Sequence, residues 1–367
     1  MDRQTVIWQV PQGVYDDGEA LAVTPEILEA ANVLREGGLV AFPTETVYGL
    51  GANGLDASAV DSIFIAKGRP SDNPLILHIA DLADLDQIVA RLPARAACLA
   101  EVFWPGPLTL VLPKTKIVPM TTTGGLDTVA VRMPAHPVAL ALIRATGVPL
   151  AAPSANVSGR PSPTRAEHVA NDLMGKIDVI LDGGPTGIGV ESTVVDCTGL
   201  TPIILRPGGV SKEDLEQAVG GPVELISHQA AEDLLDGPAP SPGMKYRHYA
   251  PKAPALLVTG EPPRLFDQLA TMARDLVAKG EQVGLMVSRE AVEYWQEQSI
   301  DTTSWEIICM GSRGDLKEIA ANIYGGLRDL DNTTVTRILL ESVPKSGLGL
   351  AIMNRLAKAA GSRIVGQ

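Results

Sequence analysis

Residues 39–50, Leu-Val-Ala-Phe-Pro-Thr-Glu-Thr-Val-Tyr-Gly-Leu, contain the pattern on which the fold class rests. The first four residues are apolar and end at Pro43, as in a short buried strand that gives way to a loop. Helical patterns stand on both sides of this strand, at residues 24–36 and 57–67. A buried strand between two helices is typical of α/β and α+β proteins.

The same alternation continues, in an irregular order, to about residue 220. Apolar runs predict strands, and longer stretches ended by glycine or proline predict helices. We therefore expect an α/β (α+β) fold with a twisted, mixed, open sheet and flanking helices. The predicted strands are residues 39–42, 75–79, 108–112, 128–133, 148–152, 179–182, 192–197 and 203–206, and the predicted helices are residues 24–36, 57–67, 82–102 (with a break near Pro93), 136–146, 164–173 and one that Ser211 caps.

A change of composition divides the chain. Residues 236–243, Asp-Gly-Pro-Ala-Pro-Ser-Pro-Gly, are typical of a linker. We predict a catalytic domain over residues 1–220, a linker over 221–253, and a smaller Rossmann-like α/β domain over 254–367. In the last range, strands are predicted at 255–259, 282–287, 305–310 and 336–341, and helices at 264–279, 315–330 and 350–360.

The composition argues against several classes of protein. The 367 residues carry a formal net charge of −13, which opposes the basic face that a nucleic-acid-coating protein needs, although a few local cations can still attract a small anion. The three cysteines are far apart, so they predict neither a disulfide framework nor a paired-cysteine metal site. The sequence has no signal-peptide pattern and no apolar run of about 18 residues, so we expect a cytoplasmic protein without a membrane anchor.

Two common nucleotide and nucleophile signatures, GxxxxGK[ST] and GxSxG, are absent from the sequence. Residues 183–189, Gly-Gly-Pro-Thr-Gly-Ile-Gly, follow a predicted strand but lead into another strand. A dinucleotide-binding glycine motif has to open a helix, because the phosphate sits on the helix N-terminus. We interpret this run as a connecting loop. Residues 347–351, Gly-Leu-Gly-Leu-Ala, lack the full motif, and packing at a helix start explains them equally well.

Polar residues gather instead where predicted strands and helices end. Lys67 and Arg69 flank a glycine at the end of a helix, and Asn73 follows them. Ser154 and Asn156 follow a short predicted strand. Ligands tend to bind at the carboxyl ends of strands in open α/β sheets, so we predict a basic pocket for an anion. Taken singly, these features also fit a solvated turn and a helix cap.

Two positions within strands have alternative interpretations. His78 is either a core histidine satisfied by its neighbours or a catalytic base. Arg132 ends an apolar strand, and a buried guanidinium needs an anionic partner. That partner is either a ligand or Glu191, which precedes another predicted strand.

Together these motifs resemble the YrdC-type threonylcarbamoyl-AMP synthases in their long, two-domain form. The resemblance covers nearly the whole chain. It includes the family's Lys-x-Arg and Ser-x-Asn signature at Lys67, Arg69, Ser154 and Asn156, and it gives these four residues the catalytic role. The other shared segments are PTETVYGL, KGRPSDNPL, FWPGPLTLVL, VAVRMP, APSANVSGRPSPT, DGGPTGIGVESTVVD, ILRPGG, SPGMKYRHYAP and GLGLAIMNRLAKAA.

The family makes threonylcarbamoyl-AMP and pyrophosphate from L-threonine, bicarbonate and ATP. A partner transferase then moves the threonylcarbamoyl group onto a tRNA adenosine beside the anticodon. The resemblance therefore implies a nucleotidyltransferase, with Mg²⁺ accompanying ATP. It implies threonine contacts at Thr44, His78, Arg132, Ala152 and Ser192, and ATP contacts at Arg69, Asn73, Thr128, Ser154, Ser162, Arg206, Tyr246 and Tyr249.

The residue types suit this chemistry. A carbamate formed on threonine's amine attacks the α-phosphorus of ATP, so two anions have to meet. Lys67, Arg69 and Arg206 can offset their repulsion, and Arg132 can bind threonine's carboxylate bidentately. For His78, binding threonine's polar groups suits this scheme better than acting as a base. The resemblance also implies that residues 245–249 fold back over the site as a lid.

Two other functions remain open from the sequence. The N-terminal fold of this family has been compared with double-stranded-RNA binders, but the net charge opposes RNA binding and no RNP-like aromatic pair is present. We expect direct tRNA binding to be weak or absent. Related domains also occur in hydrogenase-maturation carbamoyltransferases, whose zinc-finger cysteine pairs this chain lacks.

Overall fold

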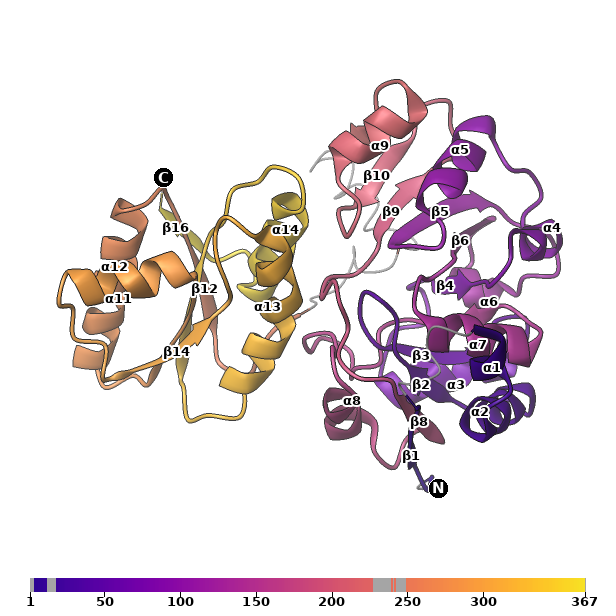
Figure 1. Ribbon diagram of the computed structural model, residues 1–367, viewed down its shortest axis with the longest axis horizontal. Helices are drawn as coiled ribbons and strands as arrows, with labels where there is room; N and C mark the ends of the chain where they lie inside the picture. The colour runs from indigo at the N-terminus through magenta and orange to yellow at the C-terminus, as the bar shows by residue number, and fades with distance from the viewer. Residues whose placement is uncertain (1–2, 12–17, 227–238, 240, 242–248, 367) are drawn as a thin grey trace. The chain divides into compact units, whose positions relative to one another are not determined.

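The computed structural model describes residues 3–11, 18–226, 239, 241 and 249–366, and it contains two separate sheets (Figure 1). Each sheet belongs to one of two compact units. The first unit lies within residues 1–246, and the second comprises the residues from 247 onward together with two short segments, 159–161 and 188–190. That the predicted domain ranges fold independently of each other stays a prediction.

The first unit is built on an eleven-stranded sheet with the order β1-β8-β2-β3-β7-β4-β6-β5-β9-β10-β11. The sheet is mixed, as predicted, because β2 runs parallel to β8 and antiparallel to β3. Its strands are β1 (Val6–Gln9), β2 (Val40–Phe42), β3 (Gly49–Asn53), β4 (Ile76–His78), β5 (Leu108–Pro113), β6 (Thr128–Arg132), β7 (Leu150–Ala151), β8 (Val179–Asp182), β9 (Thr193–Asp196), β10 (Ile203–Arg206) and β11 (Glu224–Leu225).

Helices of the first unit pack in small groups against this sheet. Helices α1, α2 and α7 lie together, and α5 lies beside α9 (Figure 1). The helices are α1 (Gly18–Ala22), α2 (Pro25–Arg35), α3 (Ala57–Lys67), the 3₁₀ turn η2 (Leu82–Asp84), α4 (Leu85–Ile88), α5 (Ala94–Phe103), α6 (Met120–Thr123), α7 (Pro137–Thr146), α8 (Ala166–Leu173) and α9 (Lys212–Val219).

The central strands have an apolar cluster on each face. Leu39 and Ala41 belong to a large cluster that includes residues of α3, α5 and α8, whereas Val40 and Phe42 belong to a second cluster with residues of α2 and α7. Successive side chains of a strand point to opposite faces. A strand buried on both faces therefore has an uninterrupted apolar sequence, as residues 39–42 do.

The second unit contains a five-stranded sheet in which every pair is parallel, with the order β14-β13-β15-β12-β16. Helices α11 and α12 lie on one side of it and α13 and α14 on the other (Figure 1). This arrangement confirms the predicted smaller α/β unit. Its elements are β12 (Ala255–Thr259), α11 (Arg264–Ala278), β13 (Val283–Val287), α12 (Arg289–Glu297), β14 (Trp305–Cys309), α13 (Leu316–Leu330), β15 (Arg337–Glu341), α14 (Gly349–Ala359) and β16 (Ile364–Gly366).

Both glycine runs singled out in the sequence have a structural explanation. Residues 183–192 connect β8 to β9 without a helix, so the interpretation of residues 183–189 as a loop is confirmed. At the start of α14, a Cβ on Gly349 would lie 1.8 Å from the carbonyl oxygen of Pro344. Glycine is required there by the close approach of the backbone, which supports the packing explanation.

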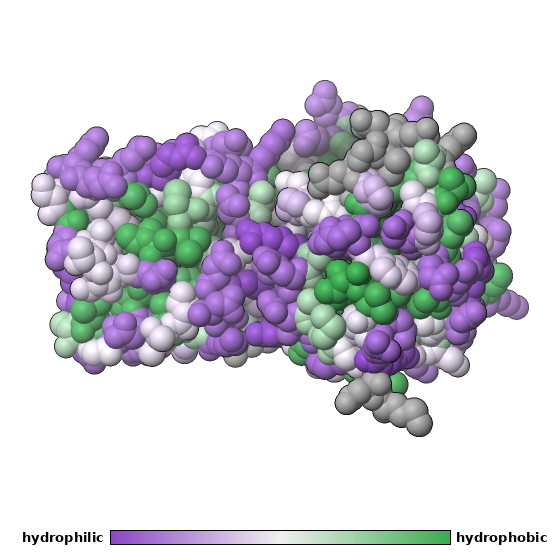
Figure 2. Space-filling view, turned by 60° about the horizontal axis from the view of Figure 1, so that its bottom comes forward, coloured by the Kyte–Doolittle hydropathy of each residue, from purple (hydrophilic) through white to green (hydrophobic). Residues whose placement is uncertain are grey.

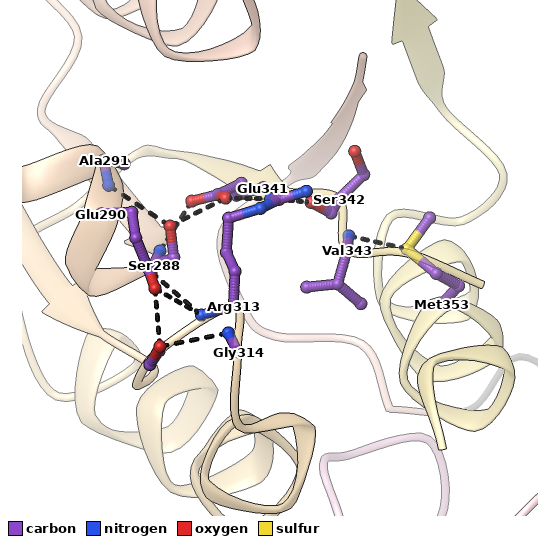
Figure 3. A network of polar contacts seen from close by, with 10 residues as sticks. Ser288, Glu290, Ala291, Arg313, Gly314, Glu341, Ser342, Val343 and Met353 are labelled. Carbon is purple, nitrogen blue, oxygen red and sulfur yellow. Dashed lines mark hydrogen bonds and ion pairs between the residues drawn. The ribbon is translucent and has the colours of Figure 1, made fainter. Parts of the chain in front are cut away.

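A polar network joins the carboxyl ends of β13, β14 and β15 in the second unit (Figure 3). Glu341 is fully buried, and its carboxylate accepts hydrogen bonds from the backbone N–H and the hydroxyl of Ser288, at 2.6 and 2.9 Å, and from Arg313. Arg313 also donates to the carbonyl oxygen of Ser342 at 2.8 Å. No buried side-chain nitrogen or oxygen atom of these residues lacks a hydrogen-bond partner, so we interpret the network as structural support for the three strands.

The surface gives no indication of a membrane segment. No helix in the part of the chain that the structure describes is long and apolar enough to cross a bilayer. On the face that Figure 2 shows, hydrophobic residues form separate patches with hydrophilic residues between them. Single exposed apolar side chains such as Leu200 and Ile65 are ordinary features of a protein surface.

Candidate functional site

One face of the first sheet carries several of the predicted site residues. His78 and Arg132 are paired directly across the parallel strands β4 and β6. Thr109, in β5, stands one residue before Leu110, which pairs with Val131, so its side chain points to the same face as that of Arg132. Apolar residues alternate with these polar ones and form a small buried cluster on that face: Ile76, Val111, Ala130, Val194 and Leu205.

The expectation that the site residues meet at the carboxyl ends of the strands is wrong for this sheet. Strand β4 runs antiparallel to β7, and His78 at the end of β4 pairs with Leu150 at the start of β7. The carboxyl ends of β4 and β6 therefore lie at the edge opposite to the end of β7, which Ser154 and Asn156 follow. The rule applies to parallel sheets, and the residues of β4, β6 and β5 are brought together here by sharing a face.

Arg132 lies at the centre of this face and is 3 % exposed. Its Nε donates to the carbonyl oxygen of Gly106 at 3.2 Å, and its NH2 lies 2.6 Å from Oε1 of Glu45. The hypothesis that Glu191 is the structural partner of Arg132 is therefore wrong. The partner comes from the loop after β2, which passes over the sheet and has no pairing pattern that a sequence could show.

Thr44, a predicted threonine contact, shapes the loop that carries Glu45. Its hydroxyl donates to the carbonyl oxygen of Val47 at 2.6 Å and accepts from the backbone N–H groups of Thr46 and Val47, both at 3.2 Å. These bonds form a local turn around a side chain that is 2 % exposed. The geometry gives Thr44 a role in holding the loop, and its contact with substrate stays a prediction.

His78 is buried, and burial together with the nearby Arg132 cation lowers its pKa to about 3. Its Nδ1 lies 3.2 Å from the carbonyl oxygen of Ile76, and its ring meets that of Phe42 edge-on. A histidine with such a pKa stays neutral at physiological pH and is a weak base. The observation argues against His78 as a general base and leaves it as a neutral hydrogen-bonding group.

We expect the stability of the protein to fall as the pH drops below 6.5, in part because of His78. The unfolded chain takes up a proton near the ordinary pKa of about 6.5, and the folded chain does not until about 3. Between pH 7.5 and 5 this difference amounts to a loss on the order of 2 kcal/mol. Thermal unfolding should therefore show a smaller loss over that range in His78→Gln. An equal loss in the two proteins would contradict the assignment.

Ser192 and Arg206 form a second group at the start of β9. The NH2 of Arg206 donates to the hydroxyl of Ser192 at 3.2 Å and to its carbonyl oxygen at 3.0 Å. The Ser192 hydroxyl is also hydrogen-bonded to Thr109 at 2.7 Å. Thr109 thus links the group to the face that carries Arg132. Thr109, which the sequence did not single out, shares a face with one predicted threonine contact, Arg132, and is hydrogen-bonded to another, Ser192.

Ser162, a predicted ATP contact, is fully buried and donates to Oε1 of Glu191 at 2.6 Å. Glu191 directly precedes Ser192, and its carbonyl oxygen accepts from the backbone N–H of Gly209 at 3.2 Å. The short segment of Glu191 and Ser192 is therefore held from two sides. It connects the residues after β7 with those after β10.

Gly208 presses against this segment, and we expect Gly208→Ala to disturb it. A Cβ at position 208 would lie 2.3 Å from the carbonyl oxygen of Glu191, the carbonyl carbon of Ser192 and the nitrogen of Thr193. These are backbone atoms, so the segment itself would have to move, at a cost of about 1–3 kcal/mol. Chemical unfolding should show this cost, and binding of L-threonine, the ligand that the resemblance implies for Ser192, should weaken. Gly221→Ala, at an open position without positive φ, is the matched control and should be neutral.

Lys67, at the end of α3, joins two predicted catalytic residues. Its Nζ donates to the carbonyl oxygens of both Ser154 and Asn156, and its side chain is 2 % exposed. The hydroxyl of Ser154 donates to Oδ1 of Asn156 at 2.5 Å. Strand β3 fixes the same loop, because Gly49 forms a backbone bridge with Ser154. Three of the four signature residues are therefore in direct contact.

Arg69 and Asn73 occupy the turn after α3. The NH2 of Arg69 donates to the carbonyl oxygens of Asn73 and Pro74 at 3.3 and 3.1 Å. The Asn73 side chain is 1 % exposed, and neither its amide nitrogen nor its amide oxygen forms a hydrogen bond with a described residue. Buried amides usually have partners, so this pair of atoms supports the predicted nucleotide contact at Asn73.

Four predicted contacts remain: Ala152, Thr128, Tyr246 and Tyr249. Ala152 is buried, and its N–H donates to the carbonyl oxygen of Ile76, while Thr128 begins β6 and is half-buried. Tyr246 lies outside the described residues. Tyr249 belongs to the second unit, where its ring packs against Tyr324 and beneath the guanidinium of Arg355. A nucleotide contact for either tyrosine stays a prediction.

Sequence reasoning missed three residues around Arg132. Glu45 and Thr109 contact members of the site, and His136 is close enough to Glu45 for the carboxylate to oppose the lowering of its pKa. Burial still dominates and lowers the pKa of His136 to about 4. The shared motif PTETVYGL contains Glu45, but no local pattern indicates that its carboxylate reaches β6.

Comparisons with known proteins show to which family the chain is similar. Two family models match the chain: one described as telomere recombination covers residues 32–208, and one described as the C-terminal domain of threonylcarbamoyl-AMP synthase covers residues 210–361. The threonylcarbamoyl-AMP synthase of Pyrococcus abyssi is 52% identical over 340 residues, which are 92% of this chain and 94% of that protein. The one of Bacillus subtilis is 50% identical over 342 residues, 93% and 94% of the two chains.

A solved structure is similar over the full length. The crystal structure of Pyrococcus abyssi Sua5 complexed with L-threonine matches with a TM-score of 0.86 and 47% sequence identity, and the match covers 100% of this chain and 99% of that one. The likeness therefore extends to both units. With both family models matched and half of its residues shared with these enzymes, the chain belongs to the threonylcarbamoyl-AMP synthases, enzymes of the nucleotidyltransferase type.

Proposed function

We propose that this protein makes L-threonylcarbamoyl-AMP and pyrophosphate from L-threonine, bicarbonate or CO₂, and ATP. The observation that carries the proposal is the buried Arg132, on one sheet face with His78 and with Thr109, whose hydroxyl is hydrogen-bonded to Ser192. A buried guanidinium suits the carboxylate of an amino acid. The similar Pyrococcus abyssi protein was solved with L-threonine, which supports the same ligand here.

The proposed reaction has two bond-forming steps. Threonine's ammonium group first gives a proton to water, and the nitrogen of the resulting amine bonds to the carbon of CO₂ and releases a second proton to water, which gives a carbamate. A carbamate oxygen then bonds to the α-phosphorus of ATP, while the bond from that phosphorus to the bridging oxygen breaks and pyrophosphate leaves. Holding a labile carbamate beside the nucleotide is a positioning task, which can contribute roughly 7–11 kcal/mol.

Cationic side chains reduce the repulsion between the carbamate and the triphosphate. Lys67, Arg69 and Arg206 are the candidates for this role, with Asn73, Ser154 and Ser162 as further ATP contacts. In the structure, each of the three cations is held by backbone carbonyl oxygens, so its position is set before ATP binds. Such preorganised charges lower the barrier without rearranging during the reaction.

We propose the Mg²⁺ as an ion that the nucleotide carries into the site. The described residues contain no group of three or more histidine, cysteine, aspartate or glutamate side chains that could hold a metal ion. Mg²⁺ commonly binds through substrate phosphates and keeps several waters. When bound, it would neutralise phosphate charge, and Asn73 and Ser162 stand among the residues proposed to contact the same phosphates.

We further propose that the product passes to a transferase partner that modifies tRNA to N6-threonylcarbamoyladenosine. The net charge of −13 supports a division of labour in which the partner holds the tRNA. A tight tRNA affinity of this chain alone that falls steeply with salt would contradict that part of the proposal.

Pyrophosphate release from ATP by the full chain tests the proposed reaction. We expect release to require both threonine and bicarbonate, and mass spectrometry should detect threonylcarbamoyl-AMP as the product. Serine and valine are suitable comparison substrates, because each keeps the zwitterion and changes the side chain. Release that continues unchanged without threonine would remove the substrate assignment.

A further inference from the structure

Glu45 is a buried carboxylate to which the predicted reaction gives no role. Its side chain is 15 % exposed, and its Oε1 lies 2.6 Å from the NH2 of Arg132. The two charges touch without hydrogen-bond geometry, so neither oxygen of Glu45 accepts a hydrogen bond from a described residue. Buried polar atoms in folded proteins nearly always have such partners. Arg132 balances the charge of Glu45, but both carboxylate oxygens still lack a hydrogen-bond donor, and this points to a ligand that supplies one.

Glu45 and Arg132 form a pair of opposite charges beside two histidines. Both neighbouring histidines, His78 and His136, are neutral near pH 7, because burial lowers their pKa values to about 3 and about 4. The Nε of Arg132 donates a hydrogen bond to the carbonyl oxygen of Gly106, and its NH2 faces the carboxylate of Glu45. The site therefore offers one positive and one negative group side by side.

Resting on the proposed function, we propose that Glu45 binds the ammonium group of threonine while Arg132 binds its carboxylate. A zwitterion carries one charge of each sign. When it binds between Glu45 and Arg132, its ammonium group can pair with the carboxylate and its carboxylate with the guanidinium, so every charge keeps a partner. If threonine's carboxylate merely displaced Glu45 from Arg132, the glutamate would stay buried without a partner, which is costly. The ammonium provides that partner and three donors.

The loop that carries Glu45 is built to hold it in place. The Thr44 hydroxyl ties together residues 44–47 through its bonds to Thr46 and Val47. The backbone N–H of Tyr48 then donates to the carbonyl oxygen of Pro163 at 2.9 Å. A carboxylate on a fixed turn loses little conformational freedom when it binds a ligand. Glu45 thereby selects for substrates with an α-ammonium group.

Isothermal titration calorimetry with L-threonine and with 3-hydroxybutyrate, which lacks the amino group, tests this inference. We expect Glu45→Gln to bind threonine about 10- to 100-fold more weakly than the unchanged protein, as for loss of a charge-assisted hydrogen bond. Its affinity for 3-hydroxybutyrate should not fall, so the ratio of the two affinities should collapse. Glu45→Asp, which keeps the charge, should recover part of the ratio. Glu167→Gln, with a carboxylate that is 63 % exposed, is the control.

The ratio of affinities within one variant does not depend on how much the substitution destabilises the fold. Glu45→Gln that binds threonine as tightly as the unchanged protein, or more tightly, would overturn the inference, because Glu45 would then only compete with threonine's carboxylate. The proposed function would survive that result. An unchanged protein that binds no threonine would overturn both.

Discussion

Lys67→Met is expected to reduce the turnover of ATP to pyrophosphate by about 100- to 1000-fold, the usual effect of removing one preorganised electrostatic contact from a transition state. The methionine side chain has a similar length and fills the buried space, so the charge and its donors are the main loss. Steady-state rates at saturating threonine and bicarbonate measure this effect. The KM for ATP measured in the same series reports how much of the contact is already made in the ground state.

Two effects of Lys67 have to be separated in that experiment. The Nζ group supports the loop through the carbonyl oxygens of Ser154 and Asn156, and it also supplies a positive charge. Loss of the donors destabilises the first unit, whereas loss of the charge slows the reaction. Thermal unfolding of each variant reports the first effect, and kcat at a temperature well below unfolding reports the second.

Lys176→Met is the matched control for Lys67→Met. The Nζ of Lys176 also donates to a backbone carbonyl oxygen, that of Asp172 at 3.3 Å, but the residue is exposed at the end of α8. Its removal should leave kcat unchanged. A folded Lys67→Met protein that keeps more than a tenth of the normal kcat would contradict the electrostatic role of Lys67.

The best-predicted elements are those that combine an apolar pattern with residues that mark where the element begins and ends. Helix α3 has the predicted bounds, because Asp56 caps its first turn and Gly68 ends it with a left-handed φ of 60°. Strand β3 was missed, since Gly49–Asn53 has the composition of a turn. A Cβ on Gly51 would lie 2.8 Å from the Phe42 ring, so tertiary packing of Phe42 explains that glycine. Local patterns carry no information about such a contact.

Short edge strands and one amphipathic helix were also missed. Strand β1 is mostly exposed, so its sequence does not alternate between apolar and polar residues, and it pairs with β8, about 170 residues away. Helix α12 buries only Ala291 and Trp295, which is too few apolar positions for a clear helical period. Strand β16 pairs with β12 at the edge of its sheet. These elements depend on neighbours that are remote in the chain.

For the candidate site, too, the sequence indicated the residue types but not their partners. The sequence indicated which side chains are unusual for their place, such as Arg132 in an apolar strand. It did not indicate that Glu45 is the partner, because the contact depends on the path of a loop held by Thr44. Nor did it place Ser192 beside Arg206, which depends on the antiparallel pairing of β9 with β10.

Arg313→Met is expected to destabilise the second unit by about 3–5 kcal/mol, the cost of leaving a buried charge without its partner. Glu341 is fully buried, and burial already raises the pKa of its carboxyl group although Arg313 and Ser288 oppose that rise. Without the guanidinium of Arg313, the charged form of Glu341 would be still less favourable in the folded protein. Because the chain contains two units, hydrogen exchange of the β13 and β15 amides is a better measure than a single unfolding midpoint.

Arg289→Met is the control for this prediction. Arg289 pairs with Glu318 at 2.7 Å on the same side of the unit, but the two side chains are 51 % and 36 % exposed. Such surface pairs contribute about 0–1 kcal/mol, so exchange in β13 and β15 should hardly change. Equal effects of the two substitutions would mean that the buried network does not support the strands.

The pH dependence of Arg313→Met distinguishes a buried charge from a simple packing defect. A carboxyl group whose pKa is raised in the folded state binds its proton more tightly there than in the unfolded chain, so its contribution to stability falls as the pH rises from its ordinary value of about 4.5 through the raised one. Removing Arg313 raises that pKa further and widens the range. The destabilisation should therefore be greatest at pH 7.5 and shrink as the pH approaches 4.5, where Glu341 becomes neutral. A packing defect would cost the same at both values, and a cost independent of pH would show that the Glu341 charge is not what Arg313 balances.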